Sequence, residues 1–190
     1  TDADAEAMVD LELASAIHHA ALDPDRWRVP PREAIAEYRQ RRREADPDGD
    51  ALVAEADGEV VGMVEMLLRG FVGEPGGARL PLPSVDVGLS VAPEWRGRGV
   101  GTALMRAAEG WARERGATRV ILDVAAANTG ARRLYERLGY ETHGLLMDRR
   151  LDIGEPGEQG DLAVVDESGG RATAVPTLDG DQVRLRPLAE

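Results

Sequence analysis

One stretch, residues 85–104, constrains the fold of this chain more than any other. It reads VDVGLSVAPEWRGRGVGTAL, and residues 85–91 alternate apolar and polar side chains in the period-two pattern of a β-strand. Pro93 ends the strand because proline has no N–H to donate to a neighbouring strand. The glycine-rich segment 96–101 then leads directly into a helix. Because a glycine-rich turn leaves the N–H groups of a helix N-terminus accessible, the stretch predicts an anion site, most naturally for phosphate.

The loop alone is compatible with several interpretations. It would serve as a tight turn without any ligand. A dinucleotide fingerprint is weak, because Thr102 stands where the third glycine of G-x-G-x-x-G is required; in that interpretation Asp123 would bind the ribose. A Walker loop needs a Gly-Lys pair, which the chain lacks. The pattern R-x-x-G-x-G is met by Arg96, Gly99 and Gly101, and it indicates a loop that binds a pyrophosphate.

Periodicity and turn residues predict an α/β chain of alternating helices and strands. Asp57-Gly58 predicts a hairpin turn, and the apolar strand 118–126 is expected to be parallel to its neighbour and buried on both faces. In chain order, the expected elements are helix 2–21, helix 30–45, strand 51–56, strand 59–68, strand 85–91, helix 100–116, strand 118–126, helix 128–139, strand 140–143 and strand 147–153.

Residues 128–140 carry a second motif, NTGARRLYERLGY. Taken singly, Asn128 would be a helix N-cap and Tyr135 an aromatic residue of the core. Together they match every fixed position of N-x-x-A-x-x-L-Y-E-x-x-G-[FY], downstream of the glycine-rich loop. On these two motifs the chain resembles the GNAT (Gcn5-related N-acetyltransferase) family, most tightly over 85–140. The resemblance implies a GNAT fold over residues 1–153, with a mixed sheet flanked by about four helices.

The resemblance implies an acetyl-CoA-dependent N-acetyltransferase acting by direct attack of a primary amine, without a metal. Tyr135 would be the general acid that protonates the leaving CoA thiolate. Asp86 or Glu65 would be the base. For each of them, a solvent-facing carboxylate on an alternating strand is an equally good interpretation. A backbone N–H near Val91 would hold the oxyanion. The weaker base candidates are His18, His19 and His143, of which the first two are expected to be surface groups at a helix end.

The resemblance also implies which residues bind the two substrates. The expected acetyl-CoA contacts are Leu89, Ser90, Val91, Arg96, Gly97, Arg98, Gly99, Val100, Gly101, Thr102, Asn128 and Tyr135. Trp27, Tyr38 and the loop 69–83 are expected to line the site of the acceptor, an amine-bearing small molecule or a protein amino group. The alternative for Trp27 and Tyr38 is core packing. The alternative function is that of a non-catalytic GNAT-like module that binds acyl-CoA.

The composition of the chain excludes several classes of partner and site. The net charge of −12 argues against general nucleic-acid binding and favours a cationic substrate. The chain has no cysteine, which excludes a thiolate nucleophile and a Cys zinc site. It has no apolar run long enough for a membrane span and no segment that reads as a signal peptide, so a cytoplasmic setting is consistent with it.

The C-terminal residues 182–190, QVRLRPLAE, resemble the first strand with which a GNAT domain opens. Placed ahead of Thr1 they would complete such an N-terminus. We therefore expect a circularly permuted chain, in which the acidic, glycine-rich segment 154–181 is a flexible linker. In the alternative, 182–190 starts a next domain. The strand would then be able to pair between two chains as a domain swap and form a homodimer.

Overall fold

The computed structural model describes residues 2–68, 82–144 and 146–148. The chain divides into two compact units, Thr1–His143 and Gly144–Glu190, and the helices and strands of the described residues lie in the first. In order they are α1 (Asp2–Leu22), α2 (Arg32–Ala45), β1 (Asp50–Ala56), β2 (Glu59–Leu68), β3 (Ser84–Val91), the short 3₁₀-helix η1 (Pro93–Trp95), α3 (Val100–Glu114), β4 (Arg119–Ile121) and α4 (Thr129–Arg137). This order confirms the predicted α/β class and most of the predicted boundaries.

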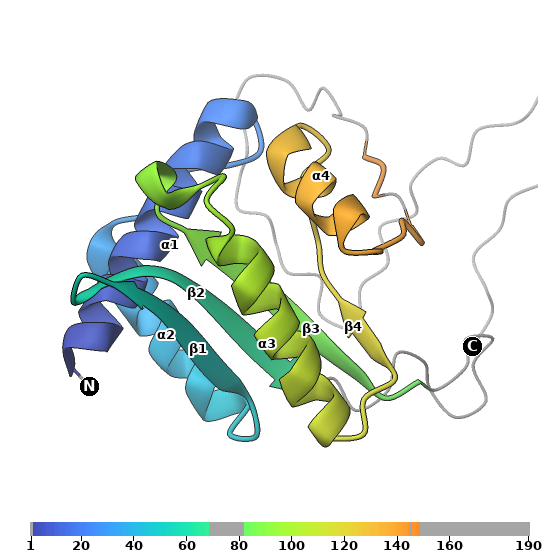
Figure 1. Cartoon of the computed structure of the whole chain (residues 1–190). Coiled ribbons are helices and arrows are strands. Elements are labelled where there is room, and N and C mark those ends of the chain that lie inside the picture. Colours follow the sequence, from blue (N-terminus) through green and yellow to red (C-terminus); the bar gives the residue numbers. More distant parts are fainter. Residues whose placement is uncertain (1, 69–81, 145, 149–190) are drawn as a thin grey trace, which may run out of the picture. The chain divides into compact units, whose positions relative to one another are not determined.

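The described strands form one mixed sheet in the order β1-β2-β3-β4 (Figure 1). The first two neighbouring pairs are antiparallel, and β3 and β4 run parallel. Between β1 and β2 the turn residues Asp57 and Gly58 have φ angles of 54° and 82°. Two successive positive φ angles are the geometry of a type I′ hairpin turn, which confirms the turn predicted from the Asp-Gly pair.

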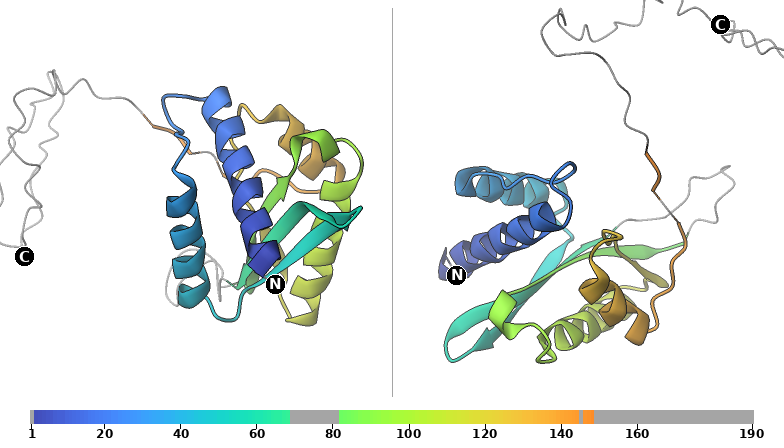
Figure 2. Two further views of the ribbon diagram at one scale, coloured as in Figure 1. Left: turned by 90° about the vertical axis from the view of Figure 1, so that its left-hand side faces the viewer. Right: turned by 90° about the horizontal axis from the view of Figure 1, so that it is seen from above.

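Helices cover both faces of the sheet, with α3 on one face and α1 and α2 on the other (Figures 1 and 2). On the α3 face, alternate residues of β2 and β3 meet the apolar stripe of α3. The fully buried members of this core include Val64, Met66, Val85 and Met105, and burying each such side chain contributes about 1.5–3 kcal/mol. On the opposite face, the buried residues Met8, Leu11, Met63 and Ala92 form a second, smaller cluster.

The structure contradicts two strand predictions. The strand predicted over 118–126 covers only Arg119–Ile121, and its residues are exposed or partly buried rather than buried on both faces. The reason is that β4 pairs with β3 alone within the described residues, and the chain leaves the sheet after Ile121. The strand predicted over 140–143 is absent, since these residues have no regular secondary structure.

Several predictions fall outside the described residues. They concern the loop 69–83 except for its last two positions, the strand 147–153 except for its first two, the linker 154–181 and the strand 182–190. In the part of the chain that the structure describes, no helix is long and apolar enough to cross a membrane.

Candidate acetyl-CoA and amine site

The parallel strands β3 and β4 separate part-way along β3. Their registered pairs are Ser84 with Arg119, Val85 with Val120, and Asp86 with Ile121. Beyond Asp86, residues 87–91 of β3 still pair with β2 but have no β4 partner among the described residues. The two parallel strands therefore diverge beyond Asp86 within the described residues. It leaves backbone N–H and C=O groups of β3 available to an extended ligand, in the way that a peptide adds to a sheet edge.

The glycine-rich loop follows directly and begins α3 beside this free edge. Gly97 and Gly99 have φ angles of 73° and 89°, which residues with a Cβ adopt only at a cost, and Gly99 is the N-cap of α3. The first helical N–H to find an acceptor is that of Ala103, which donates to the Gly99 carbonyl oxygen (3.0 Å). The N–H groups of residues 100–102 precede it and have no intrahelical acceptor, so they can bind an anion.

Gly101 brings three elements into contact. A Cβ at this position would lie 3.1 Å from Leu134 of α4, 3.5 Å from Leu89 and 3.8 Å from Val91. The missing side chain therefore lets the start of α3 pack against both β3 and α4. This contact joins the two sequence motifs into one region.

The two arginines of the loop are exposed, and each is held by a neighbouring group. Arg96 Nε donates to the Val91 carbonyl oxygen (3.1 Å), which fixes Arg96 at the end of β3. The Arg98 guanidinium lies over the Trp95 ring, 5.0 Å from its centroid, as in a cation–π contact. Both positive charges thus stay next to the N-terminus of α3, where they reinforce its attraction for an anion.

The second motif forms α4. Asn128 is its N-cap, and the Asn128 side-chain oxygen accepts from the Ala131 N–H (3.2 Å), which confirms the predicted cap. Tyr135 lies seven residues further along, on the same side of the helix and about 10 Å along its axis. It packs on the α3-side core, and burial raises the pKa of its hydroxyl above the ordinary value of 10.0. The Tyr135 hydroxyl therefore remains protonated at neutral pH, as a proton donor requires.

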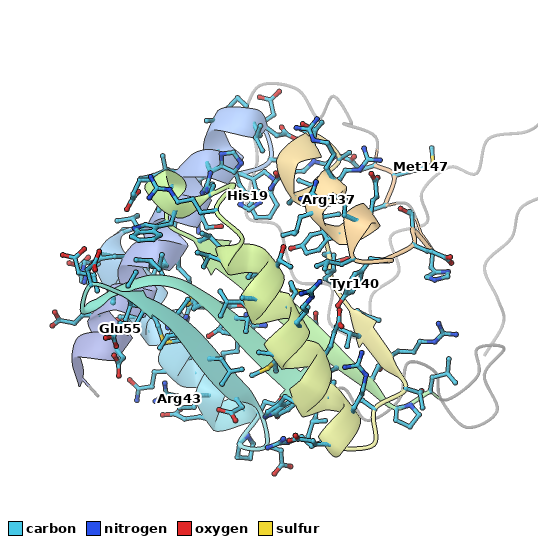
Figure 3. The ribbon with its side chains drawn as sticks, viewed as in Figure 1. His19, Arg43, Glu55, Arg137, Tyr140 and Met147 are labelled. Carbon is cyan, nitrogen blue, oxygen red and sulfur yellow. The ribbon has the colours of Figure 1, made fainter. Side chains whose placement is uncertain are left out.

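The C-terminal end of α1 lies near the start of α4 (Figures 1 and 3). His18 is partly buried and hydrogen-bonds with the side chain of Asn128. Burial and the charge of Arg96 lower the pKa of His18, against the opposing effect of this hydrogen bond. The ring of His19 stacks on Trp27, with centroids 4.7 Å apart. Neither histidine is the plain surface group expected from the sequence.

The two predicted carboxylate bases lie on the α1–α2 face of the sheet. Asp86 is opposite Leu67, and Glu65 is opposite Gly88, so the two are diagonal neighbours. Glu65 forms ion pairs with Arg39 (2.9 Å) and Arg42 (3.5 Å) of α2. Two guanidinium groups therefore hold the Glu65 carboxylate against α2.

Glu12 of α1 joins this cluster, and nothing in the sequence pattern marked it. It pairs with Arg39, and its side chain is 20% exposed. Burial raises the pKa of Glu12 above 4.5, and the charge of Glu65 acts in the same direction, while Arg39 lowers it. Ion pairs therefore join α1, α2 and β2 through Glu12, Arg39, Glu65 and Arg42.

The remaining predicted site residues are exposed. Trp27 and Tyr38 are 42% and 50% exposed, so core packing does not explain them; Trp27 lies in the α1–α2 connection and Tyr38 on α2. His143 is exposed after α4.

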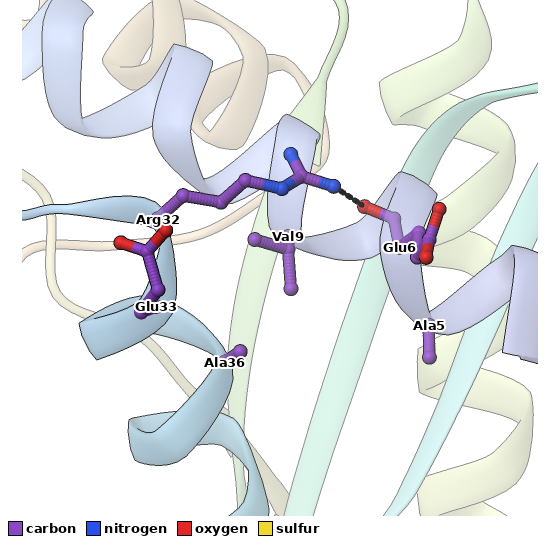
Figure 4. A pocket seen from close by; sticks show the side chains of 6 residues that line it. All are labelled: Ala5, Glu6, Val9, Arg32, Glu33 and Ala36. Atoms are coloured by element: carbon purple, nitrogen blue, oxygen red, sulfur yellow. Dashed lines mark hydrogen bonds between the residues drawn. The ribbon is translucent and has the colours of Figure 1, made fainter.

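A hollow of about 310 Å³ lies between α1 and α2 (Figure 4). Its lining residues are Ala5, Glu6, Val9, Arg32, Glu33 and Ala36. Val9 and His18 are nine residues apart on α1, about 14 Å along the helix axis, so the hollow is separate from the region around α4. In the described residues no group of three His, Cys, Asp or Glu side chains could hold a metal ion.

Comparison with known proteins agrees with this geometry. The Acetyltransferase (GNAT) family matches residues 14–140. The chain belongs to this family. It is 31% identical over 131 residues to a streptothricin acetyltransferase of Streptomyces lavendulae, an alignment that covers 68% of this chain and 65% of that protein. The chain therefore matches less than two thirds of that relative's length.

Solved structures share the fold of this GNAT chain. A transcriptional regulator from Bacillus halodurans is 25% identical, with a TM-score of 0.59 over 78% of this chain and 95% of that one. AAC(6')-Iy in complex with the bisubstrate analogue CoA-S-monomethyl-acetylneamine is 23% identical, with a TM-score of 0.52 over 74% of this chain and 90% of that one. The second likeness concerns the fold alone. The family match over residues 14–140 includes the separated strands, the glycine-rich loop and α4.

Proposed function

We propose that this chain is an N-acetyltransferase that moves an acetyl group from acetyl-CoA to a primary amine of a cationic small molecule. The observation that carries the proposal is the free edge of β3 over residues 87–91. The start of α3 packs against this edge and against α4 at Gly101. Pantetheine would pair with that edge near Leu89 and Val91. The pyrophosphate would bind the N–H groups of residues 96–102. A backbone N–H near Ser90 and Val91 would stabilise the oxyanion.

In this mechanism the acceptor amine attacks the thioester directly. Its nitrogen lone pair forms the C–N bond while the carbonyl electrons move to oxygen. When the tetrahedral intermediate collapses, the C–S bond breaks and its electron pair leaves with sulfur. Tyr135, whose raised pKa keeps the hydroxyl protonated, gives its proton to the thiolate. Holding the amine and the thioester together would supply much of the remaining rate enhancement.

Two observations support a cationic amine as the acceptor. The chain carries a net charge of −12, which attracts cations. Its 31% identical relative is named as a streptothricin acetyltransferase, and the analogue bound to AAC(6')-Iy contains acetylneamine. A panel of streptothricin, neamine, lysine and a peptide with a free N-terminus therefore samples both antibiotic amines and a protein-type amino group.

The test combines acetyl-CoA binding with turnover. Acetyl-CoA at about 100 times its Kd should stabilise the chain by about 2.7 kcal/mol, and at least one amine of the panel should release free CoA thiol. Gly99→Ala should weaken that stabilisation, since a non-glycine residue at a φ of 89° costs about 1–2 kcal/mol and distorts the start of α3. Gly110→Ala is the matched control: a Cβ at this position would meet no side chain within 4 Å, so the substitution should stabilise α3 by about 0.5–1 kcal/mol. No thermal shift with millimolar acetyl-CoA would reject the proposal.

We also propose that residues 182–190 supply a strand that pairs with β1. Within the described residues β1 pairs with β2 alone, so its other edge is open to a partner strand. Deleting 182–190 should lower the thermal midpoint and promote aggregation through that edge. Light scattering of the intact chain separates pairing within one chain from a swap between two. A deletion variant that remains monomeric, active and equally stable would contradict the proposal.

A further inference from the structure

The C-terminal end of α1 holds two histidines with different surroundings. His19 Nδ1 donates to the Ser15 carbonyl oxygen (2.9 Å), and its ring stacks on Trp27 (4.7 Å). His19 is thereby fixed to its own helix and to the α1–α2 connection. His18 lies edge-on to His19, with ring centroids 5.8 Å apart, and reaches the side chain of Asn128. His18 is therefore the member of the pair that connects α1 with α4.

Arg96 links His18 electrostatically to the open end of β3. Arg96 Nε is bonded to the Val91 carbonyl oxygen (3.1 Å), and the Arg96 charge acts on His18. His18 therefore contacts the N-cap of α4 and lies within electrostatic range of Arg96, which is bonded to the last residue of β3. The last residue of β3 is where the proposed function holds the thioester oxyanion.

The carboxylate candidates lie further from that end. Asp86 precedes Val91 by five residues, about 16 Å along an extended strand, and it belongs to the part of β3 that still pairs with β4. Glu65 is opposite Gly88, three residues before Val91 or about 10 Å, and its carboxylate is ion-paired with Arg39 and Arg42. Position and pairing therefore both favour the histidine.

We propose that His18 is the base that takes the proton from the acceptor amine, in an orientation set by Asn128 and by the stacked pair His19–Trp27. This inference rests on the proposed acetyl transfer. The neutral imidazole accepts one proton from the ammonium form of the acceptor and passes it to solvent. The neutral amine then forms the C–N bond, and its second proton leaves by the same route as the C–S bond breaks. Tyr135 gives a proton to the thiolate and regains one from solvent, so one proton is released per acetyl transferred.

The charges around His18 suit a base that works at neutral pH. The charged and titratable groups that act on it are Arg96 from the loop and His19 from its own helix, and both oppose a positive imidazolium. Burial and these two charges lower the pKa of His18 by more than the hydrogen bond with Asn128 raises it, so this pKa lies below 6.5. The imidazole is thus neutral, and able to accept a proton, at pH 7.

The experiment is a pH profile of kcat/KM for the best amine of the panel, read by thiol release. His18→Gln keeps an amide able to hydrogen-bond with Asn128 but cannot take the proton. It should lower kcat/KM by about 10²-fold and remove the acid limb that the intact chain shows below pH 6.5. The KM for acetyl-CoA and the stabilisation by acetyl-CoA should stay unchanged. Arg41→Gln, which also introduces glutamine but at an exposed position of α2, should leave the profile as it is.

Asp86→Asn provides the competing outcome. If Asp86→Asn removes the acid limb while His18→Gln retains it, His18 is not the base. A His18→Gln chain that loses stability and activity together, and keeps the acid limb, would show that His18 only supports the fold. Both results leave the proposed acetyl transfer intact. A wild-type chain that binds no acetyl-CoA would reject the transfer itself, and with it the role of His18.

Discussion

Tyr135→Phe is expected to lower kcat for acetyl transfer by about 10²- to 10³-fold, the range for loss of a general acid, with no change in acetyl-CoA affinity. The substitution keeps the aromatic ring that packs on the α3-side core and removes only the hydroxyl. Burial holds the pKa of that hydroxyl above 10.0, so the acid form persists throughout the neutral range. Steady-state kinetics with the best amine of the panel measure kcat, and calorimetry measures acetyl-CoA binding.

The neighbouring ring offers a matched control. Tyr140 lies 5.8 Å from Tyr135 between centroids, and its hydroxyl donates to Glu109 Oε1 (3.2 Å). Tyr140→Phe should therefore lower the free energy of unfolding by about 1 kcal/mol and leave kcat unchanged. If both substitutions had equal effects on kcat, or if Tyr135→Phe had no effect, Tyr135 would not be the proton donor.

Local signals in the sequence were sufficient for most of the fold. The Asp57-Gly58 turn, the N-cap Asn128 and the helix after the glycine-rich loop each depend on residues close together in the chain, and each was predicted where the structure has it. Strand 118–126 was predicted too long because an apolar run does not reveal where its pairing with β3 ends.

The side-chain arrangement of the site was harder to predict, because it depends on contacts between distant segments. His18 and Asn128 are far apart in sequence, and a histidine at a helix end carries no local sign of its partner. Glu65 follows the alternation of a strand whether it faces solvent or two arginines of α2. The exposed Trp27 becomes meaningful only through its stacking on His19. A base can therefore be chosen only after α1 and α2 are placed on the sheet.

Arg39→Met is expected to cause the largest loss of stability, about 3 kcal/mol, because removing one partner of a buried ion pair leaves uncompensated charge. The Arg39 side chain is only 10% exposed, and it pairs with Glu12 of α1 and Glu65 of β2. Ile35 is the one residue of α2 that is buried in the described structure, so Arg39 supplies much of the attachment of α2 to the sheet. Chemical denaturation measures the loss. Arg113→Met, which breaks an exposed pair with Glu109, should change stability by less than about 0.5 kcal/mol.

The titration of Glu12 shows whether the instability of Arg39→Met comes from lost charge or from lost packing. Its pKa is higher in the folded chain than the ordinary 4.5, so the folded state binds the proton more tightly. The free energy of unfolding must then fall as the pH rises from 4.5 through the folded-state pKa. Glu12→Gln should remove this dependence without destabilising the chain at pH 7, and it should partly rescue Arg39→Met by removing one of the two facing carboxylates. Acidification should also restore stability to Arg39→Met as Glu12 gains a proton. If Arg39→Met were equally unstable from pH 7 to pH 5, and Glu12→Gln gave no rescue, the loss would come from packing of the arginine stem, and α2 would not be held by charge.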